Sequence, residues 1–242
     1  YGLTLTEDGG VEQRVDDWWE SMCRSTRRVL AESGAAPEDV AGVSFCSQMQ
    51  CLVLVDKDGK PVRPAMSYMD KRGAENFEAW RKGPLQIAGV TLFKLLVSLR
   101  ETGVVAASGK DPVFRYGYVR DREPEAYARA ARWLDAKEAL IVRATGRCVM
   151  SEDSAFATLL YHPKKHAWSR RTARLHGVNP SHLPEVVRSI DPVGPLTPGA
   201  AAELGLTERA VVYAGGGDSS LIGIGCGAAR LGDTHVYIGT SG

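Results

Sequence analysis

The sequence has no CxxC pair, no basic block, no internal repeat and no apolar run near the roughly 18 residues of a membrane span. Its five cysteines are odd in number and lie mostly in apolar runs, so we expect reduced thiols in a cytoplasmic protein rather than a disulfide framework. Lysine and arginine number 30 against 29 aspartate and glutamate residues. This balance argues against nucleic acid or an anionic membrane surface as the main partner.

The chain is long enough for one large domain or two small ones, and no stretch of it is a convincing linker. Its 242 residues are 44% hydrophobic, which suits a soluble α/β protein. It starts at Tyr1 without an initiator methionine or a signal-like segment, and it ends at Gly242 directly after an expected strand. We therefore expect both ends to be artificial boundaries.

The expected elements run from strands through helices and back to strands. VAGVSFCS, residues 40–47, predicts a strand, and residues 50–70 predict a hairpin that turns at residues 56–59 in the same sheet. Residues 180–198 are rich in proline and are expected to be irregular. Helices are expected at residues 18–33, 71–81, 92–101, 113–120, 124–131, 136–145, 154–161 and 169–175. This order predicts a sheet domain with an inserted helical layer.

The C-terminal stretch, VVYAGGGDSSLIGIGCGAARLGDTHVYIGTSG, carries the chemistry. Residues 211–213 predict a strand, the three glycines after it leave room for a close approach, and Asp218 has the position of a helix N-cap. Residues 221–229 predict a buried helix, in which each glycine costs roughly 1 kcal/mol relative to alanine. A second strand, residues 234–238, runs into GTSG, a turn that can aim backbone N–H groups at an anion.

Seven segments, in this order and spacing, resemble the FGGY carbohydrate kinases and, within that family, the xylulokinase-like branch. They are GGVEQRVDDWWE, SQMQCLVLVDKDGKPVRPAMSYMDKR, IAGVTLFKLLVSLRETG, EPEAYARAARWLDAKEALIVRATG, SEDSAFATLLYHPKKHAWS, AGGGDSS and HVYIGTSG. The resemblance implies two ribonuclease-H-like domains of the actin-like ATPase type, with sugar and nucleotide in the cleft between them. Residues 1–242 are then expected to be a single α/β N-terminal domain with a mixed sheet. The family's first strand and DxGT-type phosphate loop are lacking at its start, and the second, nucleotide-side domain at its end.

The resemblance also implies a reaction, the transfer of the ATP γ-phosphoryl group to a hydroxyl of a small sugar or polyol, with ATP and Mg²⁺ as cofactors. Asp218 matches the family's catalytic base. The glycines before it are expected to let the sugar reach the carboxylate without a side chain in the way. The GTSG turn matches a phosphate-binding loop, so Gly239, Thr240 and Ser241 are expected to contact phosphate. No residue is assigned as a metal ligand.

Substrate contacts carry over to SQMQ, which gives Gln48, Met49 and Gln50 as candidates, together with Ser219. Xylulokinases usually have histidine where this chain has Gln50, and asparagine or glutamine often follows the catalytic aspartate where Ser219 stands here. Asp70 is a further candidate, which could line the cleft or merely pair with Arg72. The expected substrate is a ketopentose such as xylulose, and the sequence does not choose between a monomer and a homodimer.

Each of these assignments has a structural alternative. Asp218 could be only an N-cap, Met49 a core residue, and Gln48 and Gln50 satisfied hydrogen-bonding residues within the sheet. GTSG could be an ordinary turn at the end of a strand. At the level of the whole protein, the alternative is a catalytically silent sugar-binding or regulatory member of the same fold. The changes at Gln50 and Ser219 keep that alternative open.

Overall fold

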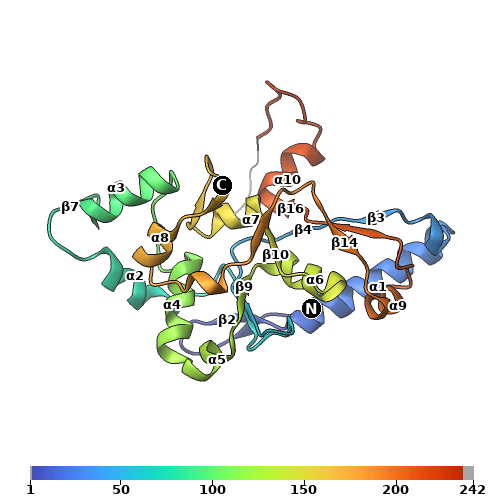
Figure 1. The fold of residues 1–242 in the computed structure, drawn as a ribbon, viewed down its shortest axis with the longest axis horizontal. Coiled ribbons are helices and arrows are strands. Elements are labelled where there is room, and N and C mark those ends of the chain that lie inside the picture. The colour runs from blue at the N-terminus through green and yellow to red at the C-terminus, as the bar shows by residue number, and fades with distance from the viewer. Residues whose placement is uncertain (1, 237–242) are drawn as a thin grey trace.

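The structure is a computed structural model that describes residues 2–236 and shows a mixed α/β arrangement (Figure 1). Helices α2, α3, α4 and α8 gather at one end of the molecule, whereas α1 and α9 lie at the other. The helices are α1 (Val15–Ser33), α2 (Ala74–Arg81), α3 (Leu92–Glu101), α4 (Pro112–Arg122), α5 (Pro124–Arg129), α6 (Ala136–Thr145), α7 (Glu152–Ala157), α8 (Arg170–Leu175), α9 (Pro198–Leu204) and α10 (Asp218–Gly225). Two 3₁₀ turns, Pro37–Asp39 and Pro180–His182, complete the helical elements.

The strands are short and pair in separate ladders, both parallel and antiparallel. The first eight are β1 (Thr4–Leu5), β2 (Val11–Gln13), β3 (Gly42–Val43), β4 (Cys46–Ser47), β5 (Val53–Val55), β6 (Ala65–Met66), β7 (Gln86–Ile87) and β8 (Val90–Thr91). The remaining eight are β9 (Arg132–Leu134), β10 (Val149–Ser151), β11 (Tyr161–His162), β12 (Ala167–Trp168), β13 (Glu185–Val187), β14 (Pro192–Pro195), β15 (Val211–Tyr213) and β16 (Gly216–Gly217).

The site is positioned by two parallel chain segments, residues 42–47 and 211–217, whose pairing is interrupted once. β3 pairs with β15, and further along β4 pairs with β16, so the strand expected at residues 40–47 is broken between Val43 and Cys46. The cause is Gly215, whose φ of 66° leaves the extended conformation while its backbone approaches Phe45 closely. Pairing resumes where the Gly216 N–H donates to the Phe45 carbonyl at 3.0 Å.

The expectation that the hairpin lies in the same sheet as the strand at residues 40–47 is wrong. The turn at residues 56–59 is confirmed, since the Asp56 N–H donates to the Lys60 carbonyl and Leu52 bridges to Met66. However, β5 pairs with β9, and β6 pairs with β2, so the two arms of the hairpin belong to different ladders. The expected helix at 124–131 ends at Arg129, and the strand that follows it, β9, was not predicted.

Residues 180–198 are more regular than expected. β13 lies parallel to β10, and β14 is an edge strand that pairs antiparallel with β15. β14 has a proline at each end, Pro192 and Pro195. Proline has no backbone N–H to donate, and an edge strand tolerates it because such a strand is hydrogen-bonded on one side only.

Helix α10 differs from its expected form in two ways. Its N-cap is Gly217, and Asp218 is the first helical residue. It ends at Gly225, and among its residues only Gly223 is buried, whereas Ile222 and Ile224 are exposed, so the expected buried helix over residues 221–229 is wrong. Of the strand expected at 234–238, residues 234–236 are not in a strand, and the rest of it lies outside the described residues.

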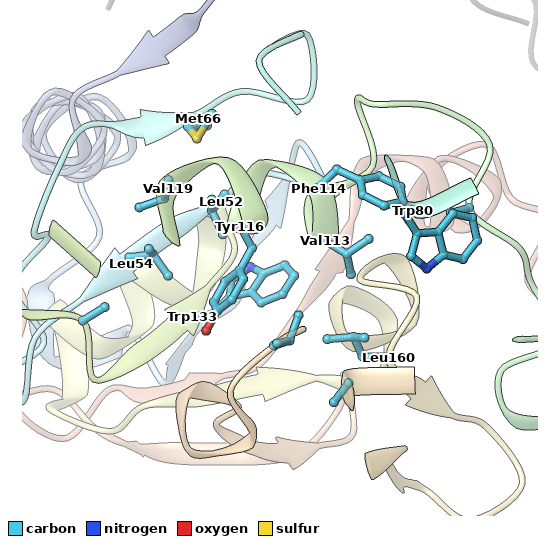
Figure 2. Close-up of a cluster of buried hydrophobic side chains, with 14 of the residues drawn as sticks. Leu52, Leu54, Met66, Trp80, Val113, Phe114, Tyr116, Val119, Trp133 and Leu160 are labelled. Carbon is cyan, nitrogen blue, oxygen red and sulfur yellow. The ribbon is translucent and has the colours of Figure 1, made fainter. Parts of the chain in front are cut away.

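The largest buried cluster lies around α4 and β9, where Tyr116 stacks on Trp133 beside Leu52 and Leu54 (Figure 2). A second cluster packs α1, α6 and α9 against β14 and β15. Within residues 2–236, the helices include none with the combination of length and apolar character that crossing a bilayer requires. The five cysteines are free thiols, as expected.

Candidate active site

Two of the expected site segments leave the sheet at the same edge. Gly217 pairs with Ser47 in the parallel β16–β4 ladder, and both strands end at these residues. The next residues along the chain, Asp218 and Gln48, therefore start side by side at the carboxyl ends of two parallel strands. In open α/β sheets this edge is where ligands bind.

The Asp218 carboxylate is exposed at this edge of the sheet. Its only hydrogen bonds within residues 2–236 come from its helix neighbour Ser219, with the N–H at 2.8 Å and Oγ at 3.4 Å. No bond to another element turns it inward, so the carboxylate can accept a hydrogen bond or proton from a ligand. Ser219, the other candidate here, is exposed beside it.

Asp153, which is not among the candidates that the sequence gives, fixes the start of α10. Its two carboxylate oxygens accept from the Gly217 N–H and the Ser220 hydroxyl, each at 2.6 Å. Asp153 lies in the first turn of α7, so α7 holds the residue that precedes Asp218. The acidic SEDS stretch marks Asp153 in the sequence. The residue that Asp153 binds, Gly217, lies 64 residues away, so no local pattern links the two.

Met49 packs directly against Gly217. A Cβ on Gly217 would lie 2.0 Å from the Met49 sulfur, so only glycine leaves space for this contact. Gly216 is similarly enclosed by atoms of Leu221 and Asp153. The expectation that these glycines open a path for the sugar is therefore wrong, because side chains of this protein fill the space that they leave. Met49 is half-buried and lies next to the residue that precedes Asp218.

Gln48 is tied to the N-terminal part of the chain. Its side-chain Nε2 donates to Oε1 of the buried Gln13 at 2.8 Å. It also lines a cavity of about 420 Å³ between α1, β4 and α6, in which Asp218 takes no part. The side-chain NH2 group of Gln48 thus makes a hydrogen bond within the protein, as the structural alternative for this residue predicted.

Gln50 has a left-handed backbone, with φ of 63°. Its N–H donates to Asp135 at 2.8 Å, and its carbonyl accepts from Arg115. The loop of residues 48–50 is therefore held by its backbone rather than by the Gln50 side chain.

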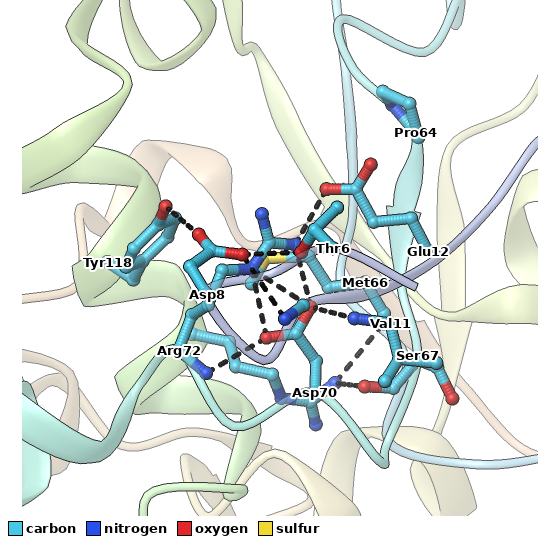
Figure 3. Close-up of polar contacts among 12 residues, drawn as sticks. Thr6, Asp8, Val11, Glu12, Pro64, Met66, Ser67, Asp70, Arg72 and Tyr118 are labelled. Carbon is cyan, nitrogen blue, oxygen red and sulfur yellow. Dashed lines mark hydrogen bonds and ion pairs between the residues drawn. The ribbon is translucent and has the colours of Figure 1, made fainter. Parts of the chain in front are cut away.

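Asp70 is fully buried and forms an ion pair with Arg72 (Figure 3). Its oxygens accept from the Val11 N–H at 2.9 Å and from the Arg72 side chain at 2.6 Å. Burial opposes the charged form of Arg72, but hydrogen bonds to Asp70 and Glu12 outweigh it and raise the pKa of Arg72. This geometry favours the pairing alternative for Asp70 over a contact with sugar.

The candidate phosphate residues Gly239, Thr240 and Ser241 lie outside the described residues. Among the other candidates, the structure brings Asp218, Ser219 and Met49 together, places Gln48 and Gln50 in the adjoining loop, and keeps Asp70 in a buried ion pair.

Comparison with known proteins identifies the family. Residues 2–225 match the family model described as the FGGY family of carbohydrate kinases, N-terminal domain. A xylulose kinase from Bacillus subtilis is 30% identical over 243 residues, which cover all of this chain and 46% of that protein. The chain thus spans about half the length of the curated relatives that it matches.

Solved structures show the same fold. A ligand-bound xylulose kinase from Lactobacillus acidophilus has a TM-score of 0.79 at 19% identity, over 93% of this chain and 43% of that one. A xylulose kinase from Rhodospirillum rubrum has a TM-score of 0.82 at 19% identity, over 96% and 46% of the two chains. These likenesses confirm the expected ribonuclease-H-like, actin-like ATPase fold. The family model, which matches nearly the whole chain, shows that this chain belongs to the FGGY family of carbohydrate kinases.

Proposed function

We propose that the protein containing this chain transfers the γ-phosphoryl group of ATP to a hydroxyl of a small sugar, with a ketopentose such as xylulose as the first candidate. Family membership and several relatives named xylulose kinase support this function. The observation that carries it is the exposed Asp218 carboxylate, at the sheet edge where the loop of residues 48–50 also begins.

In this mechanism Asp218 accepts the proton of the attacking sugar hydroxyl as phosphate is transferred. The Asp153 contacts fix the start of α10, so the carboxylate approaches the hydroxyl from a defined direction. Met49 provides an apolar surface beside Gly217, while Ser219 and the amides of Gln48 and Gln50 offer polar groups for sugar hydroxyls.

Gly239, Thr240 and Ser241 remain the proposed phosphate contacts, through backbone N–H and hydroxyl groups. Among residues 2–236, no three acidic, histidine or cysteine side chains are grouped so that they could hold a metal ion. Mg²⁺ often reaches kinase sites bound to nucleotide phosphates and needs few protein ligands, so we propose Mg-ATP as the substrate form. The need for ATP is the reason to propose a cytoplasmic location.

The test is phosphate transfer by the full-length protein with Asp218→Asn, measured as ADP formation over a panel of pentuloses, hexuloses and polyols. We expect kcat to fall by roughly 10² or more, because a positioned base has been removed, while the sugar Kd stays within a few fold. Asp58→Asn in the exposed hairpin turn is the matched control and is expected to keep wild-type kcat.

Unchanged turnover in Asp218→Asn contradicts the assignment of the base. If the wild-type protein binds sugar but forms no ADP with any member of the panel, the silent sugar-binding alternative is correct and the proposed function is wrong.

A further inference from the structure

The backbone at Gln50 is held in a conformation that a residue with a side chain rarely adopts. Its φ of 63° lies in the left-handed region, where a non-glycine residue costs roughly 1 kcal/mol or more. Such a conformation persists only when the surroundings impose it. The contacts of Gln50 therefore show what imposes it.

Asp135 accepts from the N–H of Gln50 and from that of the next residue. Its Oδ2 accepts from the Gln50 N–H and its Oδ1 from the Cys51 N–H, both at 2.8 Å. Oδ1 also accepts from the Ala136 N–H at 2.7 Å, so the same side chain caps α6. Asp135 is 3% exposed. One buried carboxylate thus joins the start of a helix to two successive amides of a loop 85 residues earlier in the chain.

Arg115 of α4 holds the other side of the same peptide. Its Nη2 donates to the Gln50 carbonyl, and its Nη1 donates to the carbonyls of Met66 and Ser67. Arg115 is completely buried and uses backbone carbonyls as acceptors. Both the N–H and the carbonyl of Gln50 are therefore fixed by charged side chains from the protein interior.

The ionisable groups around Asp135 come from α6, from α4 and from the segment just before β5. Glu138 and Lys137 of α6, the Cys51 thiol and Arg115 face it. Burial and the Glu138 charge raise the pKa of Asp135 to about 7, although Lys137 and the bonded N–H groups act in the opposite direction. The ionised carboxylate accepts all three N–H hydrogen bonds more strongly than the protonated acid, whose own O–H would face these donors.

These contacts end one residue from Met49, whose sulfur fills the space beside Gly217 and so adjoins Asp218. We propose that Asp135 is a positioning residue, which sets the backbone of residues 48–50 so that Met49 and Gln50 present themselves to the sugar beside Asp218. This inference rests on the proposed function, because it assigns Asp135 to the sugar side of that same site.

The test uses Asp135→Ser in the full-length protein. Serine still caps α6, but its short side chain does not reach the Gln50 and Cys51 amides. Loss of hydrogen bonds to a charged group predicts a rise of about tenfold or more in the sugar KM, with a smaller change in kcat and an unchanged ATP KM. Thr197→Ala, which removes the cap of α9 instead, is the matched control and is expected to leave the sugar KM unchanged.

Two further readouts separate positioning from stability. In the wild type, the sugar KM is expected to rise as the pH falls through about 7, because protonation of Asp135 weakens its hydrogen bonds to the loop amides, and Asp135→Ser is expected to lose this dependence. Amide hydrogen exchange at Gln50 and Cys51 is expected to speed up in Asp135→Ser and to stay slow in Thr197→Ala.

An unchanged sugar KM in an Asp135→Ser protein that still transfers phosphate overturns the inference. So does unchanged exchange at Gln50 and Cys51. If the wild type transfers phosphate to no sugar while the exchange result is as expected, the proposed function has failed. The contact of Asp135 with the loop then stands, but its assignment to a sugar site is overturned with that function.

Discussion

At the scale of single residues, Gly215 sets the geometry of the strand that leads to Asp218. Its φ of 66° is unfavourable for any other residue, and a Cβ there would lie 2.2 Å from the Phe45 carbonyl oxygen. Backbone cannot move aside as the end of a flexible side chain can. The interruption between β15 and β16 therefore depends on this glycine.

We expect Gly215→Ala to lower the free energy of unfolding by roughly 3 kcal/mol, from the combined backbone strain and overlap with Phe45. Gly199→Ala is the control, since a Cβ at Gly199 in α9 meets nothing within 4 Å. It is expected to leave stability unchanged or to raise it by up to about 1 kcal/mol. Urea unfolding of the two variants measures the difference, and equal midpoints would show that Gly215 can be replaced.

At the scale of elements, the packing of α8 against α2 buries an imidazole ring. His176, directly after α8, stacks on Trp80 of α2 with ring centroids 4.9 Å apart. Burial, together with the nearby Lys94 charge, lowers the pKa of His176 to about 4. The folded protein therefore holds this ring neutral, whereas the unfolded chain protonates it near pH 6.5.

The unfolded state binds the His176 proton more tightly than the folded state does. The stability that the neutral, buried ring contributes is therefore fully present above pH 6.5 and is lost as the pH falls toward 4. The loss at low pH is roughly 3 kcal/mol. We expect His176→Phe to flatten the fall in stability over this range, as measured by urea unfolding at successive pH values. His235→Phe at the exposed end of the described chain should keep the wild-type slope. Parallel profiles for wild type and His176→Phe would contradict this account.

At the scale of the whole molecule, α6 is joined to β10 and α7 by a buried ion pair and its hydrogen bonds. Lys137 and Glu138 are both completely buried, and the Lys137 ammonium also donates to Ser151 of β10 at 2.7 Å and Ser154 of α7 at 2.8 Å. This group of polar residues joins α6 to the helix that carries Asp153.

Removal of one partner leaves the other charge buried without compensation. We expect Lys137→Met to cost roughly 3–5 kcal/mol of unfolding free energy, and the double change Lys137→Met with Glu138→Leu to cost clearly less. The exposed pair Arg28–Glu32 serves as the comparison, where Arg28→Ala should cost about 0.5 kcal/mol or less. Equal losses for the single and double Lys137 variants would mean that the charge itself is unimportant.

The same scale shows what could be predicted from the sequence. The bounds of α3 and α6 were confirmed because apolar periodicity was clear, and for α6 Gly146 marks the end. β9 and β14 were missed because strands of three or four residues give almost no periodicity. The prediction that α10 is buried was wrong because burial depends on what packs over a helix, not on the composition of the helix alone.

The site was partly predictable for a similar reason. Asp218 and the loop of residues 48–50 lie at strand ends, where local patterns and the family resemblance both point. Asp153 and Asp135 act on residues 64 and 85 positions away, and no local pattern reveals such partners. The Asp70–Arg72 pair lies only two residues apart, and that alternative was visible in the sequence.

The attachment of Gly217 to Asp153 has a mechanical consequence. Since α7 also contacts β10 and the serines around Lys137, a rotation of α7 would carry the start of α10 with it. The position of the Asp218 carboxylate relative to an alcohol therefore depends on α7, which lies outside the β4–β16 pair. We therefore expect substitutions in the buried residues that α7 packs on to change kcat, although none of these residues contacts the sugar.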